Sequence, residues 1–297
     1  MKIATAAYHM TPPSTWSDYA QKIEDWVSEA AGQGADLLLF PEYGAMELAM
    51  LDGPDVAADL ERSLHAVSDR IPDADDLHAD LSARYNVHIC AATGPVFDDE
   101  ISPRPVNRAR FFSPAGGRVH QDKQIMTRYE REQWDIRPGG PLRVIETALG
   151  KIGILICYDV EFPLLARALV EAGAEIILAP SCTEALSGYN RVRIGAMARA
   201  LENQCVVVHS PTVGVAPWCE PTDANTGTAA VYGPPDLGFP DSGVIAQGAL
   251  NRPGWVYADV SLDAIARVRA EGRVANHADW RRQAGLAEPL RQVDLRG

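Results

Sequence analysis

The feature that most constrains this chain is a short apolar run, Ile152–Ile156, which stops abruptly at Cys157. Acidic residues and Pro163 follow the cysteine, and a helical pattern then begins. This pattern predicts a buried strand that turns sharply into a helix, with Cys157 at the corner. Backbone N–H groups at such a corner favour a thiolate and could stabilise an oxyanion. Because lone cysteines are more often packing residues, the segment alone leaves both interpretations open.

Composition describes an ordinary soluble globular chain, because 46% of its 297 residues are apolar and 23% are charged. This length allows one large domain or two small ones. The formal net charge of −13 argues against nucleic acid and anionic membranes as partners. Neither a stretch long enough to cross a bilayer nor a signal-peptide core is found, so we expect a cytoplasmic protein.

Cysteine and histidine spacing gives no sign of a structural metal or a disulfide framework. The five cysteines are an odd number without a C-x-x-C pair, and the seven histidines are scattered. A nucleotide-binding glycine motif is also missing. We therefore expect neither a metal nor a cofactor.

The order of the expected elements predicts an α/β chain with a mixed sheet and no linker that would split it. Alternating or continuous apolar runs predict strands at 2–8, 36–40, 87–92, 106–112, 118–120, 142–145, 151–156, 175–179, 205–209, 228–232, 243–248 and 255–260. Helical spacing predicts helices at 16–32, 55–70, 74–84, 161–172, 187–203 and 261–271. Residues 123–141 read as an irregular charged loop, and the last twenty or so residues as an arm.

Two further polar residues follow predicted strands, where functional groups gather in α/β sheets. Glu42 comes after the strand that ends at Phe40, and Lys123 follows the short strand that ends at His120. An acid in a loop or a single lysine is usually a solvated surface charge, so each signal is weak by itself. Their order and spacing relative to Cys157 are what give them weight.

Taken together, these segments resemble the nitrilase superfamily of carbon–nitrogen hydrolases, with the order glutamate, lysine, cysteine. The segments that carry this resemblance, which runs from residue 2 to about 262, are Phe40-Pro-Glu-Tyr43, Lys123, Glu132 to Gly139, Cys157-Tyr-Asp-x-x-Phe-Pro163, Gly173 to Ser181 and Arg199 to Gln204. Within the family, Cys-x-Asp after the nucleophile is typical of amidases and carbamoyl hydrolases, whereas nitrilases tend to carry Cys-Trp-Glu. Glu161 and Leu164 depart from the common form of the motif.

The resemblance implies a four-layer α-β-β-α sandwich. We expect residues 1–265 to form the carbon–nitrogen hydrolase domain and residues 266–297 to form a C-terminal arm at an oligomer interface. The family usually forms homodimers or larger homo-oligomers, and it implies a small-molecule amide or carbamoyl substrate without a cofactor.

Amide hydrolysis needs a nucleophile, a base, an oxyanion donor and an acid for the leaving amine. A thiol has an ordinary pKa near about 8.5 and must be activated. Glu42 can act as the base if burial and a nearby Glu132 raise its pKa. Glu132 is also expected to orient Lys123 and to position the substrate or the returning proton. Lys123 and the backbone N–H of Tyr158 would then stabilise the oxyanion. On residue types alone, a Cys–His dyad with His209 or His120 stays open.

The expected reaction is hydrolysis of a non-peptide amide or N-carbamoyl bond through a thioester at Cys157. Three alternatives remain: a nitrilase, an acyltransferase that uses the same thioester, and a catalytically silent relative that binds a ligand. Loops at the same sheet edge supply candidate substrate-binding residues, and Arg191 and Arg193 could bind a carboxylate. The candidates are Tyr43, Tyr129, Glu130, Trp134, Glu161, Thr183, Glu184, Tyr189 and Trp218.

Overall fold

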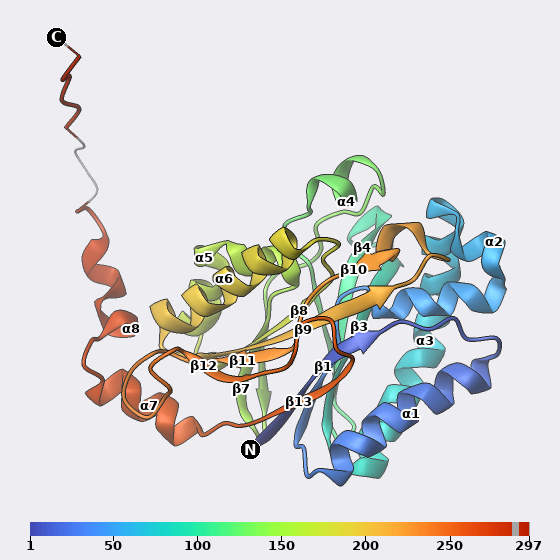
Figure 1. Cartoon of the computed structure of the whole chain (residues 1–297), viewed down its shortest axis with the longest axis horizontal. Coiled ribbons are helices and arrows are strands. Elements are labelled where there is room, and N and C mark those ends of the chain that lie inside the picture. Colours follow the sequence, from blue (N-terminus) through green and yellow to red (C-terminus); the bar gives the residue numbers. More distant parts are fainter. Residues whose placement is uncertain (287–290, 297) are drawn as a thin grey trace.

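Two packed β-sheets with helices on both outer faces make up the protein, as Figure 1 shows for a computed structural model that describes residues 1–286 and 291–296. The first sheet has the order β5 (Arg118–Asp122), β4 (Ser102–Phe112), β3 (His88–Asp98), β2 (Leu37–Leu39), β1 (Lys2–His9) and β13 (Gly254–Asp259). The second has the order β6 (Val144–Thr147), β7 (Gly150–Ile154), β8 (Ile176–Ser181), β9 (Val206–Val215), β11 (Ala230–Tyr232) and β12 (Val244–Gln247).

The two sheets meet where the end of β1 pairs with the end of β9, at Tyr8 with Thr212 and His9 with Val213. In each sheet the central strands, β1 to β3 and β7 to β9, run parallel to their neighbours within that group, and the outer strands are antiparallel. The short strand β10 (Ala224–Asn225) pairs with the end of β9. The carboxyl ends of the parallel strands are therefore available to build a site.

Long helices cover the outer face of each sheet. The first sheet is covered by α1 (Trp16–Gly32) and α3 (Leu60–Tyr85), and the second by α5 (Pro163–Glu171) and α6 (Leu186–Asn203) (Figure 1). The remaining helices are η1 (Gly44–Asp52), α2 (Pro54–Ala57), α4 (Arg128–Glu132), η2 (Cys157–Glu161), η3 (Glu220–Thr222), α7 (Leu262–Glu271), α8 (Asn276–Asp279) and η4 (Trp280–Gln283). This arrangement confirms the expected four-layer sandwich.

The alternation of side chains along a strand explains how β2 packs in two apolar cores, one on each face of its sheet. In β2, Leu37 and Leu39 belong to the core between the sheets, whereas Leu38 packs in the core beneath the outer helices. Successive side chains of a strand point to opposite faces, so a strand buried on both sides must be apolar throughout. In α1, Ile23 and Val27 close the outer core over this sheet.

Two of the element predictions are wrong. The helices expected at 55–70 and 74–84 are mainly one helix, α3, which continues through Pro72 and begins after Asp59, whose carboxylate accepts hydrogen bonds from two N–H groups of its first turn. The loop expected at 123–141 contains the helix α4. Thr127 caps this helix in a capping box with Glu130, and that signal is local in the sequence.

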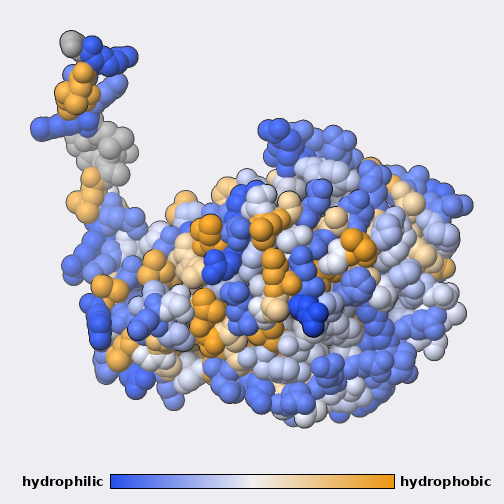
Figure 2. All heavy atoms as spheres, viewed as in Figure 1, coloured by the Kyte–Doolittle hydropathy of each residue, from blue (hydrophilic) through white to orange (hydrophobic). Residues whose placement is uncertain are grey.

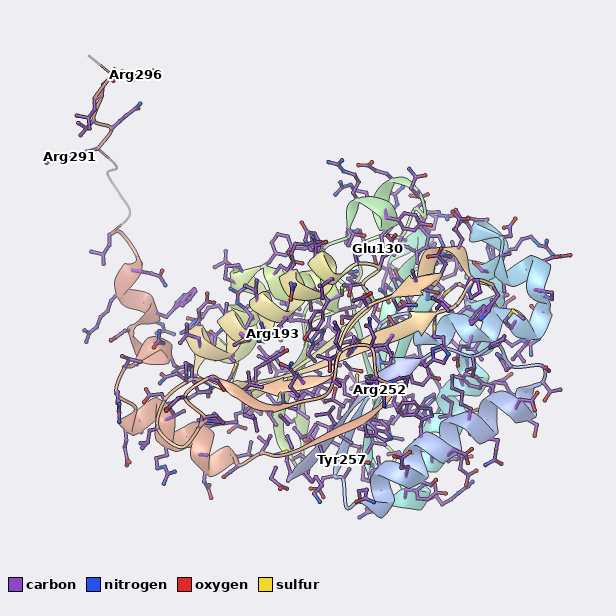
Figure 3. All side chains as sticks on the ribbon, in the orientation of Figure 1. Glu130, Arg193, Arg252, Tyr257, Arg291 and Arg296 are labelled. Atoms are coloured by element: carbon purple, nitrogen blue, oxygen red, sulfur yellow. The ribbon has the colours of Figure 1, made fainter. Side chains whose placement is uncertain are left out.

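The C-terminal segment begins as part of the core and then leaves it. Helix α7 runs across the expected boundary at residue 265, and both Ile265 and Val268 are buried. Figures 1 and 3 show the segment that carries Arg291 and Arg296 projecting away from the sandwich. The part of the predicted arm at residues 287–290 and 297 lies outside the described residues.

The visible surface is mostly hydrophilic, but hydrophobic residues gather over α6 (Figure 2). Leu186, Ile194 and Leu201 of this helix are exposed. Within residues 1–286 and 291–296, no helix combines the length and the apolar character needed to span a bilayer.

Candidate active site

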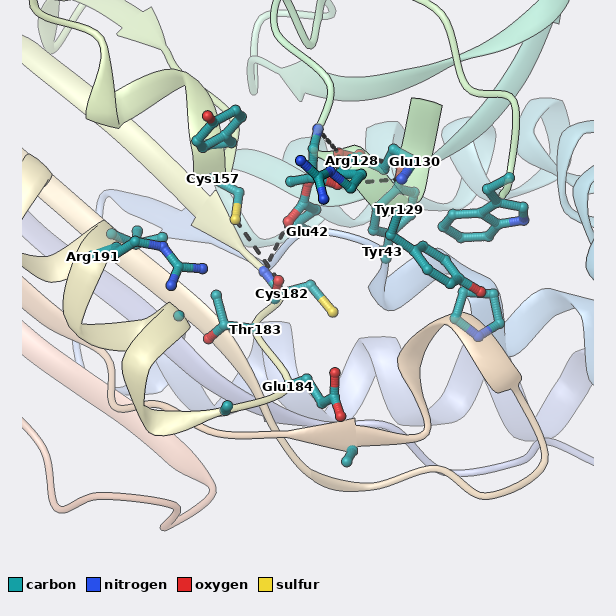
Figure 4. A pocket seen from close by; sticks show the side chains of 18 of the residues that line it. Glu42, Tyr43, Arg128, Tyr129, Glu130, Cys157, Cys182, Thr183, Glu184 and Arg191 are labelled. Atoms are coloured by element: carbon teal, nitrogen blue, oxygen red, sulfur yellow. Dashed lines mark hydrogen bonds between the residues drawn. The ribbon is translucent and has the colours of Figure 1, made fainter. Parts of the chain in front are cut away.

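The candidate site forms where strands of both sheets end (Figure 4). Glu42 follows β2 and Lys123 follows β5 of the first sheet, whereas Cys157 follows β7 and Cys182 follows β8 of the second. All four residues line one pocket of about 860 Å³. The sequence prediction that Glu42, Lys123 and Cys157 lie together is therefore confirmed by their positions.

The centre of the pocket is a buried ion triplet. The ammonium nitrogen of Lys123 lies 2.7 Å from Oε1 of Glu42 and 2.7 Å from both carboxylate oxygens of Glu130. All three side chains are almost completely buried. A buried charge must be paired to persist, so the two carboxylates hold the ammonium in place.

Glu42 is fixed at both of its oxygens. Oε1 accepts a hydrogen bond from Nδ2 of Asn107 at 2.9 Å in addition to the one from Lys123, and Oε2 accepts one from the backbone N–H of Cys182 at 2.9 Å. Asn107 stands on β4 and Cys182 follows β8, so both sheets hold this carboxylate.

The second glutamate beside the lysine is Glu130, and the prediction that Glu132 fills this place is wrong. The carboxylate of Glu130 accepts hydrogen bonds from the hydroxyl of Tyr43 at 2.7 Å and from the backbone N–H and hydroxyl of Thr127 at 2.9 and 2.8 Å. Glu132 has a side chain that is 50% exposed and pairs with Arg128 and Arg131. Two residues apart on a helix, the glutamates point in nearly opposite directions.

Cys157 occupies the corner that the sequence predicts. It begins η2 with a φ of 50°, in the left-handed region that non-glycine residues rarely adopt. Its Sγ lies 3.7 Å from the carbonyl oxygen of Cys182. Burial, together with the neighbouring carboxylate of Glu42, raises the pKa of the Cys157 thiol well above its ordinary value. The thiol of Cys157 is therefore neutral at rest and would need a base to act as a nucleophile.

The surroundings of Glu42 give its carboxyl a pKa that suits proton exchange near neutral pH. Burial raises the pKa of Glu42 to about 7 even though Lys123 opposes the change, and the negative charge of Glu130 adds to it. Burial opposes the charge of Lys123, but Glu130 and Glu42 outweigh it and raise the pKa of Lys123. Burial also acts against the charge of Glu130, but Lys123 and the hydrogen bonds to Glu130 lower its pKa. Lys123 and Glu130 thus stay charged while Glu42 can exchange a proton near neutral pH.

Asp159 connects the turn that begins at Cys157 to the segment that follows Lys123. Its carboxylate accepts hydrogen bonds from the backbone N–H groups of Gln124, Ile125 and Ile156, at 2.8 to 3.2 Å. The side chain is 1% exposed. Lys123 and Cys157, which come from different sheets, are held together through this one carboxylate.

Most of the sequence-predicted substrate-binding residues line the pocket. They are Tyr43, Tyr129, Glu130, Trp134, Glu161, Thr183 and Glu184. Tyr158, which follows Cys157, lines the pocket as well. Trp134 packs against Tyr43 with ring centroids 4.7 Å apart and is buried. Glu161 pairs with Arg191, which also lines the pocket, at 3.7 Å.

Tyr189, Trp218 and Arg193 are not among the residues that line the pocket. Tyr189 is buried instead, and its ring stacks on His209 at 5.8 Å between centroids. Residues that sequence reasoning missed include Asn107 and Cys182, which contact Glu42, and the pocket-lining Glu220 and Asp223. No local signal marks them, because they reach the site only through sheet pairing and a long loop.

Among the residues that the structure describes, no histidine lines this pocket. Nε2 of His209 bonds to the hydroxyl of Ser181 at 2.7 Å, and burial lowers the pKa of His209 to about 3. Neither His209 nor His120 lines the pocket. The arrangement favours a carboxylate base over the Cys–His dyad that residue types had left open. Among the described residues, no group of three or more His, Cys, Asp or Glu side chains is placed to bind a metal ion.

Comparison with known proteins identifies the family of the chain. The sequence model of the carbon–nitrogen hydrolase family matches residues 2–270. The Bacillus subtilis (strain 168) protein named "Probable hydrolase YhcX" is 35% identical over 283 residues, which cover 95% of this chain and 54% of that protein. A deaminated glutathione amidase of Yersinia enterocolitica is 33% identical over 145 residues, 46% of this chain and 50% of the relative. The chain thus spans about half the length of these curated relatives.

A solved structure shares the fold. The amidase from Nesterenkonia sp. AN1, in a mutant form that shows Michael addition of acrylamide at its active-site cysteine, has a TM-score of 0.68 and 22% sequence identity. The match covers 94% of this chain and 99% of that one.

Proposed function

The chain belongs to the carbon–nitrogen hydrolase family, and we propose that it hydrolyses a small non-peptide amide or N-carbamoyl bond, with release of ammonia or an amine. The observation that carries this proposal is the position of Lys123, whose ammonium lies 2.7 Å from both Glu42 and Glu130 in the pocket that contains Cys157. The pocket thus combines a thiol, a base of raised pKa and a fixed cation, which acyl transfer needs. Amidases among the relatives support the same reaction class.

In the first half of the reaction, Sγ of Cys157 attacks the carbonyl carbon of the substrate while its proton passes to Glu42. The negative charge that develops on the carbonyl oxygen is stabilised by Lys123 and by the backbone N–H of Tyr158. The carbon–nitrogen bond then breaks, and the protonated Glu42 returns its proton to the leaving nitrogen. Ammonia or an amine departs, and the acyl group stays on Cys157 as a thioester.

In the second half, water attacks the thioester and gives a proton to Glu42. The carbon–sulfur bond breaks, the acid leaves, and Cys157 regains a proton. Glu42 therefore acts as a base twice and as an acid twice, which fits a carboxyl whose pKa is raised to about 7.

The three N–H donors of Lys123 face Oε1 of Glu42 and both carboxylate oxygens of Glu130. Lys123 would therefore stabilise the oxyanion through its positive charge and through a donor that turns away from one oxygen of Glu130. We assign to Glu130, rather than Glu132, the role of orienting Lys123. The pocket residues Tyr43, Tyr129, Trp134, Glu161, Thr183 and Glu184 are proposed to contact the substrate.

Ammonia release from a panel of amides, N-carbamoyl amines and nitriles tests the reaction. We expect release from at least one amide or N-carbamoyl amine, and none from it with Cys157→Ala. Turnover of a nitrile without turnover of its amide would contradict the proposal and identify a nitrilase. Hydroxamate formation in the presence of hydroxylamine would report the thioester.

Thiol labelling separates the nucleophile from its neighbour. Intact-mass measurement after iodoacetamide should show one fast label that is lost in Cys157→Ala and kept in Cys182→Ala, since both thiols line the pocket. A folded protein that hydrolyses no member of the panel and leaves Cys157 unlabelled would favour the ligand-binding alternative.

The expected homodimer or larger homo-oligomer stays a proposal. So does the division of the chain into a domain of residues 1–265 and an arm of residues 266–297. Exposed apolar side chains on α6, among them Ile194 at 63% exposure, support association through that helix. Light scattering should give the mass of a dimer or a larger assembly for the wild type and a lower mass for Ile194→Asp. An unchanged mass would exclude α6 as the contact.

A further inference from the structure

A second pocket, of about 450 Å³, lies where the C-terminal helices meet α5. We call it the arginine pocket, because Arg167 of α5, Arg269 of α7 and Arg281 of η4 line it together with His277 of α8 and Glu171 of α5. Its volume is in the range of small-molecule sites. It shares no lining residue with the candidate active site.

Charge sets the arginine pocket apart from the rest of the molecule. Three guanidinium groups face one carboxylate among its lining residues, although the whole chain has a formal net charge of −13. Glu171 lies 3.1 Å from Nε of Arg167 and 3.7 Å from Nε of Arg281. One carboxylate cannot balance three guanidinium groups, so a net positive charge remains.

Arg167 is held rigidly at the pocket wall. Its side chain is 6% exposed, its NH1 donates a hydrogen bond to the carbonyl oxygen of His277 at 3.1 Å, and its guanidinium stacks on Trp280 at 5.1 Å from the ring centre. A guanidinium fixed in this way is preorganised, so little side-chain entropy is lost when it binds an anion.

Arg269 is partly buried, and within the described residues no carboxylate forms an ion pair with it. Its Nε donates to the carbonyl oxygen of Gln204 at 3.0 Å, and its NH2 donates to that of Ala174 at 3.2 Å. By contrast, each of the four buried arginines among the described residues pairs with a carboxylate. These arginines are Arg108, Arg110, Arg167 and Arg199. Burial lowers the pKa of Arg269, and the charge of Arg167 adds to this, whereas Cys205 and Glu175 act in the opposite direction.

The imidazole of His277 responds to the same surroundings. Burial lowers its pKa, and the positive charges of Arg269 and Arg167 lower it further, whereas Glu171 opposes them. The neighbourhood is therefore one in which an additional positive charge is unfavourable and a negative charge is favourable.

We propose that the arginine pocket binds a small anion through a carboxylate or phosphate group, held by the guanidinium groups of Arg167, Arg269 and Arg281. Guanidinium groups bind the planar or tetrahedral oxyanions of these groups through paired N–H donors. The anion would bridge α5 and α7 to η4, because each of these elements supplies one arginine. It would thereby fix the direction in which the C-terminal segment leaves the core.

Thermal unfolding of the full chain tests the proposal, with inorganic phosphate and citrate as probes and sodium chloride at equal ionic strength as reference. A site filled at ten times its Kd should raise Tm by about 2–4 °C above the chloride reference. Arg269→Gln and Arg281→Gln should each remove most of this rise. Phosphate and citrate are compared because they separate a phosphate preference from a carboxylate preference.

Arg267→Gln is the matched control, since Arg267 is exposed on the same helix and does not line the arginine pocket. It should keep the full rise in Tm. An equal rise in Arg269→Gln and the wild type, or no rise beyond chloride, would overturn the proposal. A third result would also overturn it: neither anion raises Tm, and Arg269→Gln lowers the molar mass of the protein in solution. The pocket would then bind an acidic segment of a second copy of the chain.

Discussion

The carboxylate of Asp159 accepts a hydrogen bond from the backbone N–H of Ile125 at 2.8 Å, which joins the turn that begins at Cys157 to the segment after Lys123. Gln124 and Ile156 donate to the same carboxylate. The relative position of Cys157 and Lys123 therefore depends on a residue that touches neither reacting group.

Replacement of Asp159 by Asn should loosen this link. The amide has only one oxygen, and its NH₂ group would face N–H donors, so a buried backbone group is left without an acceptor. We expect the free energy of unfolding to fall by about 1–3 kcal/mol, measured by urea denaturation. The kcat should fall as well, because Lys123 moves relative to Cys157. Asp241→Asn, at an exposed position, should change neither quantity; an unchanged kcat in Asp159→Asn would refute the link.

The two glutamates of α4 offer a matched pair of variants. Glu130→Gln removes a charge that lies 2.7 Å from Lys123, so the ammonium loses half of its support, and we expect kcat to fall by about 10²–10³-fold. Glu132→Gln changes an exposed side chain two residues away and should leave kcat within about twofold. Steady-state kinetics on the same substrate compare them. A large loss in Glu132→Gln with none in Glu130→Gln would restore the original sequence prediction.

The dependence of kcat/KM on pH should follow the ionisation of Glu42. The thiol proton needs an ionised carboxylate, so kcat/KM should fall tenfold per pH unit below about 7, where the pKa of Glu42 lies. Asn107→Ala removes a hydrogen bond that favours the ionised form of Glu42, so the pKa of Glu42 should rise. The acid limb of the plot of kcat/KM against pH should then move up by about one pH unit. Asn203→Ala is the control, because Asn203 is equally buried and bonds to Arg199. An acid limb that does not move in Asn107→Ala would exclude Glu42 as its source.

Removal of the buried ammonium should make stability depend on pH. In Lys123→Met, Glu42 and Glu130 lose their shared partner, so unfolding at pH 7.5 should become easier by about 3–5 kcal/mol. Both carboxyls would then have pKa values above those of the unfolded chain, so the deficit should shrink as pH falls toward 5 and grow as pH rises. Lys151→Met breaks an exposed pair with Glu146 and should cost about 0–1 kcal/mol at either pH. A deficit in Lys123→Met that does not change with pH would show that the carboxyls are not its cause.

The residues that the sequence places correctly are those at the ends of strands. Apolar runs that stop at Phe40 and Ile156 put Glu42 and Cys157 at the carboxyl ends of parallel strands. These strands belong to different sheets, and the stacking of the sheets brings the two residues into one pocket. To choose between Glu130 and Glu132, one must know which way each side chain points. That direction depends on where the helix begins. The Thr-x-x-Glu spacing from Thr127 to Glu130 was the available signal, since a capping box fixes that starting point.

Other contacts could not be predicted from local patterns. Asn107 reaches Glu42 from a neighbouring part of the first sheet, and the N–H of Cys182 reaches it from the second. Both depend on how strands far apart in the chain pair and on how the sheets stack. Tyr189 was predicted to face the pocket, but its side of α6 packs toward His209 on β9. The face that a helix residue presents is set by this docking.

Because the first sheet supplies Glu42 and Lys123 and the second supplies Cys157, neither sheet holds a working set of groups by itself. A chain in which only one half has formed carries either an acid–base pair with nothing to activate or a thiol with nothing to deprotonate it. Under the proposed mechanism, hydrolysis therefore requires both sheets to be docked, so substrate turnover would report the completed sandwich.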